Sequence, residues 1–154
     1  VRSARQMHEA VLQAARGADI YIGAAAVGDY RPSAISAHKL KKAAGAPLHL
    51  ELTENPDIIA SLAALDGRPF LVGFAAETRE LASYAGDKLR RKGIDMIAAN
   101  EVGDGKGFEV ADNALHLYWP GGDESLPEMP KTELARRLVA RIAERFLSGS
   151  GTTP

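Results

Sequence analysis

Three short apolar runs, separated by stretches with helical spacing, constrain the fold of this chain most strongly. The runs lie at residues 20–27, 69–76 and 94–99, and each is bounded by polar or glycine-containing segments. Such runs are typical of strands that are buried on both faces of a parallel sheet. Helices that alternate with them must cover both faces. The pattern therefore predicts a doubly wound, Rossmann-like α/β fold with a mainly parallel sheet and helices on both faces.

Four further segments have helical spacing and are expected to form the covering helices: residues 2–17, 55–65, 78–92 and 130–147. The second of them has a typical helix start. Asn55 can cap a helix, Pro56 suits the first helical position, and Asp57 favours the positive end of the helix dipole. Its free N–H groups are also a generic anion site, although plain capping is the more ordinary interpretation.

Two other segments alternate with period 2 and are expected to form more exposed strands, at residues 48–52 and 114–119. Residues 31–47 show no clear periodicity and carry Lys39, Lys41 and Lys42. Long connections of this kind are often lids or binding loops. A solvated cluster of charges is the more ordinary interpretation of these lysines, and a lid that brings a cation over a polyphosphate is the alternative.

Length and composition exclude several classes of protein. The 154 residues fit one domain, expected at 1–148 with a flexible tail at 149–154. A net charge of -1 gives no general reason to expect nucleic acid or an anionic membrane as partner. The chain has no cysteine, and its four histidines have no ligand spacing, so no metal site built by the protein is expected. No apolar run approaches the roughly 20 residues of a transmembrane helix.

The ends of the three apolar runs are the first candidate for a binding site, because ligands of such sheets bind beyond the carboxyl ends of the strands. Each run changes abruptly from small apolar residues to a polar one, at Asp29, Glu77 and Asn100. Any strand must end in a polar loop, but small residues at three strand ends together favour close approach of a ligand to the backbone. No Walker A motif or G-x-G-x-x-G fingerprint accompanies them.

The helix at 78–92 gives the sharpest clue to the ligand. At about 100° per residue, four apolar side chains share one arc of it: Leu81, Tyr84, Ala85 and Leu89. Lys88 and Lys92 fall within the same arc, whereas Arg90 falls opposite. Two ammonium groups on a core-facing side are costly unless they are paired or reach an anion. The alternatives are a pair that contacts phosphate and two packed stems with their charged heads in water.

Several of these segments together resemble the phosphopantothenoylcysteine synthetase family, the C-terminal half of the bacterial bifunctional coenzyme A flavoproteins. The segments that carry the resemblance are residues 22–31, 39–42, 55–58, 72–78, 99–102, 107–108 and 112–115. They follow in order and with similar spacing over nearly the whole chain. Each motif alone is weak, whereas the set is highly specific.

The resemblance implies a CTP-dependent ligase in coenzyme A biosynthesis. Members of the family join 4′-phosphopantothenate to cysteine through an acyl-cytidylate, with release of pyrophosphate and then CMP. The resemblance also implies a cytoplasmic homodimer and Mg²⁺ that is bound with CTP, held mainly by phosphate oxygens. No FMN is expected, because the flavin-dependent decarboxylase half of these flavoproteins does not match this chain.

The same resemblance assigns roles to individual residues. The nucleotide-binding residues that it implies are Gly23, Ala24, Ala25, Asp29, Lys39, Pro56, Asp57, Ile58, Ile59, Phe74, Lys88 and Lys92. Asp29 is expected beside the CTP and its Mg²⁺. Lys39 is expected on a flap, where it stabilises the charge that develops on the α-phosphate and so has the catalytic role.

One departure from the family leaves alternatives open. The family's first strand, its glycine-rich turn and an Asn-containing segment have no match at residues 1–18. The ligase domain at 1–148 is therefore expected to be incomplete at its N-terminus. One alternative is a fragment that binds CTP without complete catalysis. The other is a nicotinamide-dependent Rossmann oxidoreductase whose glycine fingerprint lies in the unmatched region.

Overall fold

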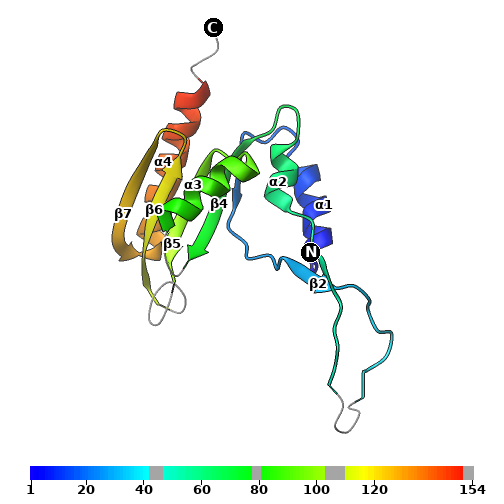
Figure 1. The fold of residues 1–154 in the computed structure, drawn as a ribbon. Coiled ribbons are helices and arrows are strands. Elements are labelled where there is room, and N and C mark those ends of the chain that lie inside the picture. Colours follow the sequence, from blue (N-terminus) through cyan, green and yellow to red (C-terminus); the bar gives the residue numbers. More distant parts are fainter. Residues whose placement is uncertain (42–46, 78–80, 103–109, 151–154) are drawn as a thin grey trace.

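The fold, seen in a computed structural model, is a five-stranded sheet with helices on both faces and a two-stranded arm that projects from it (Figure 1). The structure describes residues 1–41, 47–77, 81–102 and 110–150. Its helices are α1 (Ala4–Ala14), α2 (Ile58–Ala63), α3 (Leu81–Lys92) and α4 (Lys131–Ser150). Its strands are β1 (Ile20–Gly23), β2 (Tyr30–Pro32), β3 (Leu52–Glu54), β4 (Phe70–Glu77), β5 (Met96–Glu101), β6 (Asp112–Trp119) and β7 (Gly122–Pro130).

The strands of the main sheet follow the order β1-β4-β5-β6-β7. β1, β4 and β5 are parallel, with Gly23 beside Gly73 and Ala76 beside Asn100 in the register. β6 and β7 extend the sheet by antiparallel pairing. The predicted α/β fold is confirmed, and the carboxyl ends of the three parallel strands meet at one edge of the sheet.

Each face of the sheet carries its own apolar core. On one face, α4 packs three buried side chains of its predicted stripe, Leu134, Leu138 and Ile142, against β4, β5, β6 and β7. The fourth, Phe146, meets Phe70 edge to face at a centroid distance of 6.2 Å. On the opposite face α1, α2 and α3 cover β4 and β5. The prediction of helices on both faces is therefore confirmed.

β7 is an element that the sequence analysis does not predict. Two prolines, Pro127 and Pro130, interrupt its sequence, although Leu126 and Met129 are buried in the α4-side core. Proline lacks an N–H and is tolerated mainly on edge strands, which is the position that β7 occupies. Because its outward side chains are charged or small, the strand carries little apolar signal of its own.

The predicted extent of the first apolar run is wrong. β1 ends at Gly23, and residues 24–29 leave the sheet. Ile22 is 39% exposed, because β1 is the edge strand of the described sheet and no neighbour covers its far side. The small residues after Gly23 therefore form a loop beyond the strand end rather than the end of a buried strand.

The predicted start of the second helix is also wrong by two residues. Asp57 is the N-cap of α2 and accepts a hydrogen bond from the Ala60 N–H at 3.1 Å. Asn55 instead closes the base of the arm. Its side chain donates to the Gly28 carbonyl at 2.8 Å, and its N–H donates to the Asp29 carbonyl at 2.7 Å. The side-chain oxygen of Asn55, which a cap needs as acceptor, accepts from the Arg31 guanidinium at 3.2 Å, so Asn55 is not available as a cap.

The arm consists of β2 and β3, which pair antiparallel, and of the long connection between them (Figure 1). The strand predicted at 48–52 lies too early, since only Leu52 belongs to β3. The described residues from 33 to 41 and from 47 to 51 are exposed, so the alternation there has no sheet face to bury. Lys42, Thr78, Gly107 and Phe108 lie outside the described residues.

The last helix is longer than predicted. α4 continues through Gly149 and Ser150, and the remainder of the predicted tail lies outside the described residues. The first helix is shorter than the predicted 2–17, since α1 spans only Ala4–Ala14. Within the described part of the chain, no helix combines the length and apolar character that crossing a membrane requires.

Candidate functional site

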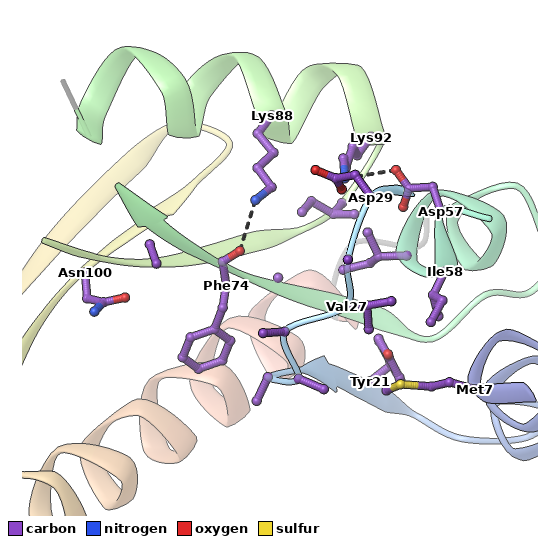
Figure 2. A pocket seen from close by; sticks show the side chains of 18 of the residues that line it. Met7, Tyr21, Val27, Asp29, Asp57, Ile58, Phe74, Lys88, Lys92 and Asn100 are labelled. Atoms are coloured by element: carbon purple, nitrogen blue, oxygen red, sulfur yellow. Dashed lines mark hydrogen bonds and ion pairs between the residues drawn. The ribbon is translucent and has the colours of Figure 1, made fainter. Parts of the chain in front are cut away.

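A cleft of about 830 Å³ opens at the carboxyl ends of β1 and β4 (Figure 2). The loop after β1, the base of the arm and the start of α2 form one wall, and α3 contributes two lysines. The end of β5, the start of β6 and the first turns of α4 form the other wall. The cleft therefore lies where ligands of parallel α/β sheets bind.

Ten of the twelve residues predicted for the nucleotide site line this cleft. They are Ala24, Ala25, Asp29, Pro56, Asp57, Ile58, Ile59, Phe74, Lys88 and Lys92. They come from segments up to 68 positions apart, from Ala24 to Lys92, which only the parallel sheet brings together. Gly23 and Lys39 are not part of the lining.

Gly23 makes room for a neighbour rather than lining the cleft. A Cβ atom at this position would lie 3.2 Å from Cε1 of Tyr21, whose ring lines the cleft beside Met7 (Figure 2). Gly73 has a similar role, because a Cβ there would lie 3.1 Å from Cδ1 of Ile94. Both glycines let larger side chains pack across the strand ends.

Lys39 lies on the exposed part of the arm and contributes nothing to the cleft wall. Its neighbour Lys41 is also exposed. Among its described residues, the arm reaches the cleft through its base, where Asp29, Tyr30, Glu54 and Asn55 line the wall. If Lys39 contacts a nucleotide as predicted, that contact lies beyond the cleft lining.

The helical phase predicted for α3 is confirmed. Ala85 and Leu89 are buried, and Lys88 and Lys92 point toward the strand ends (Figure 2). The Arg90 side chain is 76% exposed on the outer side, where it pairs with Asp87. The side chains of Leu81 and Tyr84 lie outside the described residues.

The two lysine heads engage protein groups at the cleft rather than bulk water alone. The Lys88 ammonium donates to the Phe74 carbonyl at 3.0 Å, directly at the end of β4 (Figure 2). Lys92 forms an ion pair with Asp57 at 2.9 Å, and only 24% of its side chain is exposed. Two ammonium groups one helical turn apart are thereby fixed over the strand ends.

The Asp57 carboxylate links α2 to α3. One oxygen caps Ala60 and the other binds Lys92. Burial raises the pKa of Asp57, but the hydrogen bonds from Lys92 and the Ala60 N–H and the charges of Lys92 and Lys88 outweigh it, so the net pKa lies below its ordinary value of 3.8. Asp57 is therefore an anion at neutral pH, and it offsets part of the positive charge of the cleft.

The acidic side chains of the lining, Asp29, Glu54 and Asp57, all lie on the wall built by the arm base and α2. Among the described residues, no group of three or more His, Asp or Glu side chains is placed to hold a metal ion. One or two carboxylates suit a Mg²⁺ ion that keeps water and phosphate oxygens as its other ligands.

Seven polar residues of the cleft are missing from the predicted site: Tyr21, Tyr30, Glu54, Asn55, Asn100, Asn113 and Lys131. Tyr21 lines the α2 side, and burial raises the pKa of its phenol. Asn100, Asn113 and Lys131 line the α4 side. Asn100 is visible in the sequence as a polar strand end, but nothing links Asn113 to Lys131 until the unpredicted β7 is known to fold back along β6.

Comparison with known proteins places nearly the whole chain in one family. The family model described as "DNA/pantothenate metabolism flavoprotein C-terminal domain" matches residues 1–146. The coenzyme A biosynthesis bifunctional protein CoaBC of Vibrio cholerae is 47% identical over 149 residues, which cover 95% of this chain and 37% of that protein. CoaBC of Escherichia coli K12 is 43% identical over 150 residues, again 95% of this chain and 37% of that protein.

A solved structure agrees with these sequence matches. The crystal structure of the C-terminal domain of a coenzyme A biosynthesis bifunctional protein CoaBC superposes with a TM-score of 0.74 at 33% identity. The match covers 97% of this chain and 65% of that structure. The chain thus spans a little over a third of the length of the curated relatives that it matches.

The Asp57 ion pair predicts a pH-dependent effect on stability. Asp57→Asn keeps an oxygen for the cap but removes the charge that pairs with Lys92. Because the Asp57 side chain is 44% exposed, we expect a loss of about 0.5 kcal/mol in the free energy of unfolding at pH 7. The folded-state pKa is depressed, so this contribution is present above the ordinary pKa of 3.8 and is lost as the pH falls below it.

Urea denaturation of both proteins at pH 7 and near pH 3 measures this difference. The gap between wild type and Asp57→Asn should narrow at the lower pH. Asp87→Asn is the matched control, because its ion pair with Arg90 is on the exposed outer side of the same helix. A gap that stays constant or widens on acidification would show that the carboxylate is not stabilised by Lys92.

Proposed function

This chain belongs to the DNA/pantothenate metabolism flavoprotein C-terminal domain family, and we propose that it provides the nucleotide site of a CTP-dependent phosphopantothenate–cysteine ligase in coenzyme A biosynthesis. The proposal rests on the naming of its relatives as coenzyme A biosynthesis proteins and on the match over nearly the whole chain. The observation that carries it is the pair of ammonium groups, Lys88 and Lys92, fixed over the carboxyl ends of β1 and β4.

The proposed roles follow from the chemistry of each wall. Lys88 and Lys92 bind oxyanions of the nucleotide, since ammonium groups make strong charge-assisted hydrogen bonds to phosphate. Asp29 lies at the arm base, where its exposed carboxylate can share a Mg²⁺ ion that arrives with CTP. That ion neutralises the charge of the triphosphate when it is bound.

The base and ribose need apolar and backbone contacts. Residues 56–59 and Phe74, all in the cleft lining, offer them. Ala24 and Ala25 have side chains small enough for a ligand to approach the main chain closely. Gly23 acts indirectly in this arrangement, because its missing side chain gives Tyr21 its place in the lining.

The proposed reaction has two steps. A carboxylate oxygen of 4′-phosphopantothenate attacks the α-phosphorus of CTP, and the bond to the leaving pyrophosphate breaks. The cysteine amine then attacks the acyl carbon, CMP leaves with the bonding electrons, and the amine loses a proton. Lys39 stabilises the charge that develops on the α-phosphate in the first step, which is electrostatic catalysis by a cation.

The proposed assembly is a homodimer in the cytoplasm. The arm supports it, because five large apolar side chains are exposed on the arm: Ile35, Leu40, Leu48, Leu50 and Leu52. Exposed apolar residues that gather on one element are typical of interaction surfaces. A second copy of the chain is the partner that we propose for them.

Release of pyrophosphate from CTP and 4′-phosphopantothenate tests the proposal, and the subsequent appearance of phosphopantothenoylcysteine tests the second step. CTP binding without release of pyrophosphate would assign the chain the narrower function of nucleotide binding. This alternative is specific, because the chain covers 37% of the length of its relative. Stabilisation of the fold by NADH and not by CTP, in parallel thermal melts, would exclude both.

Lys88→Ala should weaken CTP binding far more than Arg90→Ala. Of these two side chains, Lys88 faces the strand ends and Arg90 does not. A hydrogen bond to a charged group contributes about 1.5–3 kcal/mol, so we expect the Kd of Lys88→Ala to rise roughly 10-fold to 100-fold. Arg90→Ala removes the same charge from the outer side of the helix and is the matched control. Isothermal titration of both variants with CTP decides the matter, and equal effects would refute the proposed phosphate contact.

Lys39→Ala should slow the formation of the cytidylate more than it weakens CTP binding. The reason is that Lys39 lies outside the cleft wall and is proposed to act on charge that appears only in the transition state. Loss of one such donor typically lowers the rate by about 100-fold or more. Single-turnover release of pyrophosphate measures the step, with Lys41→Ala as the control on the same arm. Normal turnover of Lys39→Ala would show that Lys39 is a solvated arm residue without a catalytic role.

A further inference from the structure

His8 joins two helices behind the wall of the cleft. α1 and α2 lie side by side (Figure 1), and Nε2 of His8 lies 2.9 Å from the Ser61 hydroxyl, 53 positions away in the chain. Both residues are half-buried, and neither lines the cleft. Their neighbours do line it, since Met7 precedes His8 and residues 56–59 precede the turn that carries Ser61. The pair can therefore act on a bound ligand only through the residues that it holds in place.

The hydrogen-bond partners assign the proton of the His8 ring. The Ser61 hydroxyl donates to the Asp57 carbonyl at 2.7 Å, and a carbonyl oxygen can only accept. Because a hydroxyl has a single proton, the Ser61 oxygen is left as the acceptor toward His8. The neutral imidazole thus carries its proton on Nε2 and donates it to Ser61.

Asp57 receives this hydrogen-bond network with both its main chain and its side chain. Its carbonyl accepts from the Ser61 hydroxyl and from the Ser61 N–H, the latter at 3.0 Å. Its carboxylate accepts from the Ala60 N–H at 3.1 Å and pairs with Lys92 at 2.9 Å. One chain of contacts therefore runs from His8 to an ammonium group of the cleft lining.

α2 is too short to keep its first turn in place without tertiary contacts. It spans six residues, Ile58–Ala63, whereas an isolated helix in water is marginal below roughly 12–15 residues. Buried Ile58 and Leu62 anchor one side of it in the core. α1 is longer, and a capping box of Ser3 and Gln6 closes its start. The hydrogen bond from α1 is therefore a support for the turn of α2 that borders the cleft.

We propose that His8 is a positioning residue for nucleotide binding, whose hydrogen bond to Ser61 fixes the first turn of α2 and with it the Asp57–Lys92 pair. This inference rests on the proposed function, because it assumes that Lys92 binds an oxyanion of the nucleotide. An ammonium group has several N–H donors, so the bond to Asp57 leaves others for a ligand. Holding the group in place before the ligand arrives lowers the entropic cost of binding.

Three substitutions of His8 differ in whether they keep its donor within reach of Ser61. His8→Leu removes the donor and keeps a good helix former, so the Kd for CTP should rise roughly 3-fold to 10-fold, as expected for the loss of one neutral hydrogen bond. His8→Gln places an amide N–H near the position of Nε2 and should restore the wild-type Kd to within about 2-fold. His8→Asn carries the same amide on a shorter side chain and should behave like His8→Leu.

Isothermal titration with CTP and Mg²⁺ measures these Kd values, and Glu9→Gln, an exposed neighbour on α1, is the matched control. Ser61→Ala should raise the Kd as much as His8→Leu does, and the double variant should raise it no further, because both changes break the same link. Alanine is a better helix former than serine, so a loss of CTP affinity in Ser61→Ala without a lower melting temperature separates positioning from general destabilisation.

Amide hydrogen exchange locates the effect in the absence of nucleotide. The Ala60 and Ser61 N–H groups both bond to Asp57, so they should exchange several-fold faster in His8→Leu than in the wild-type chain. The Asp95 N–H, which donates to the Leu71 carbonyl at 3.0 Å, lies at the opposite edge of the sheet and should exchange at its wild-type rate.

The outcomes separate this inference from the proposed function. Unchanged CTP affinity in folded His8→Leu overturns the inference, as does an equal loss of affinity in His8→Gln and His8→Leu. Exchange that accelerates at Asp95 as much as at Ala60 and Ser61 also overturns it, because His8 would then only stabilise the whole fold. A wild-type chain that does not bind CTP overturns the proposed function and the nucleotide-binding role of His8 with it, whereas the exchange rates still decide whether His8 fixes α2.

Discussion

The parallel pairing of β1, β4 and β5 is the constraint on which the rest of the structure depends. Parallel strands point their carboxyl ends the same way, so the loops that follow them must meet at one edge. Gly23 and Gly73 stand side by side near that edge, and each gives its space to a larger neighbour, Tyr21 and Ile94. Everything proposed for the cleft follows from this convergence.

The two edges of the sheet differ in how their charged groups are arranged. At the amino-terminal edge, Asp95 accepts a hydrogen bond from the Leu71 N–H and pairs with Arg68, so the charges there satisfy one another. At the carboxyl-terminal edge, Lys92 pairs with Asp57 and Lys88 donates to the Phe74 carbonyl, so both ammonium groups are held at the cleft.

The sequence predicts elements that have one dominant signal. The buried strands, the stripe of α4 and the phase of α3 follow from apolar spacing, and they locate Lys88 and Lys92 correctly. The prediction from sequence fails where several neighbouring residues suit the same structural role. Asn55, Pro56 and Asp57 all suit a helix start, and only the arm-base contacts of Asn55 decide that Asp57 is the cap. The sequence does not predict β7, because its prolines are untypical of a strand inside a sheet and β7 is an edge strand. Without β7, the sequence does not predict that Lys131 lines the site either.

The account's central claim is that a nucleotide binds at the carboxyl-terminal edge of the parallel strands. Titration of the ¹⁵N-labelled chain with CTP and Mg²⁺, followed by two-dimensional amide NMR, tests it most directly. The account predicts chemical-shift changes in the amides of residues 24–29, 73–76 and 88–92. It predicts none at Asp19, Arg68 and Asp95, which lie at the opposite edge. Shift changes centred on that opposite edge, or no shift changes at saturating CTP, would contradict it.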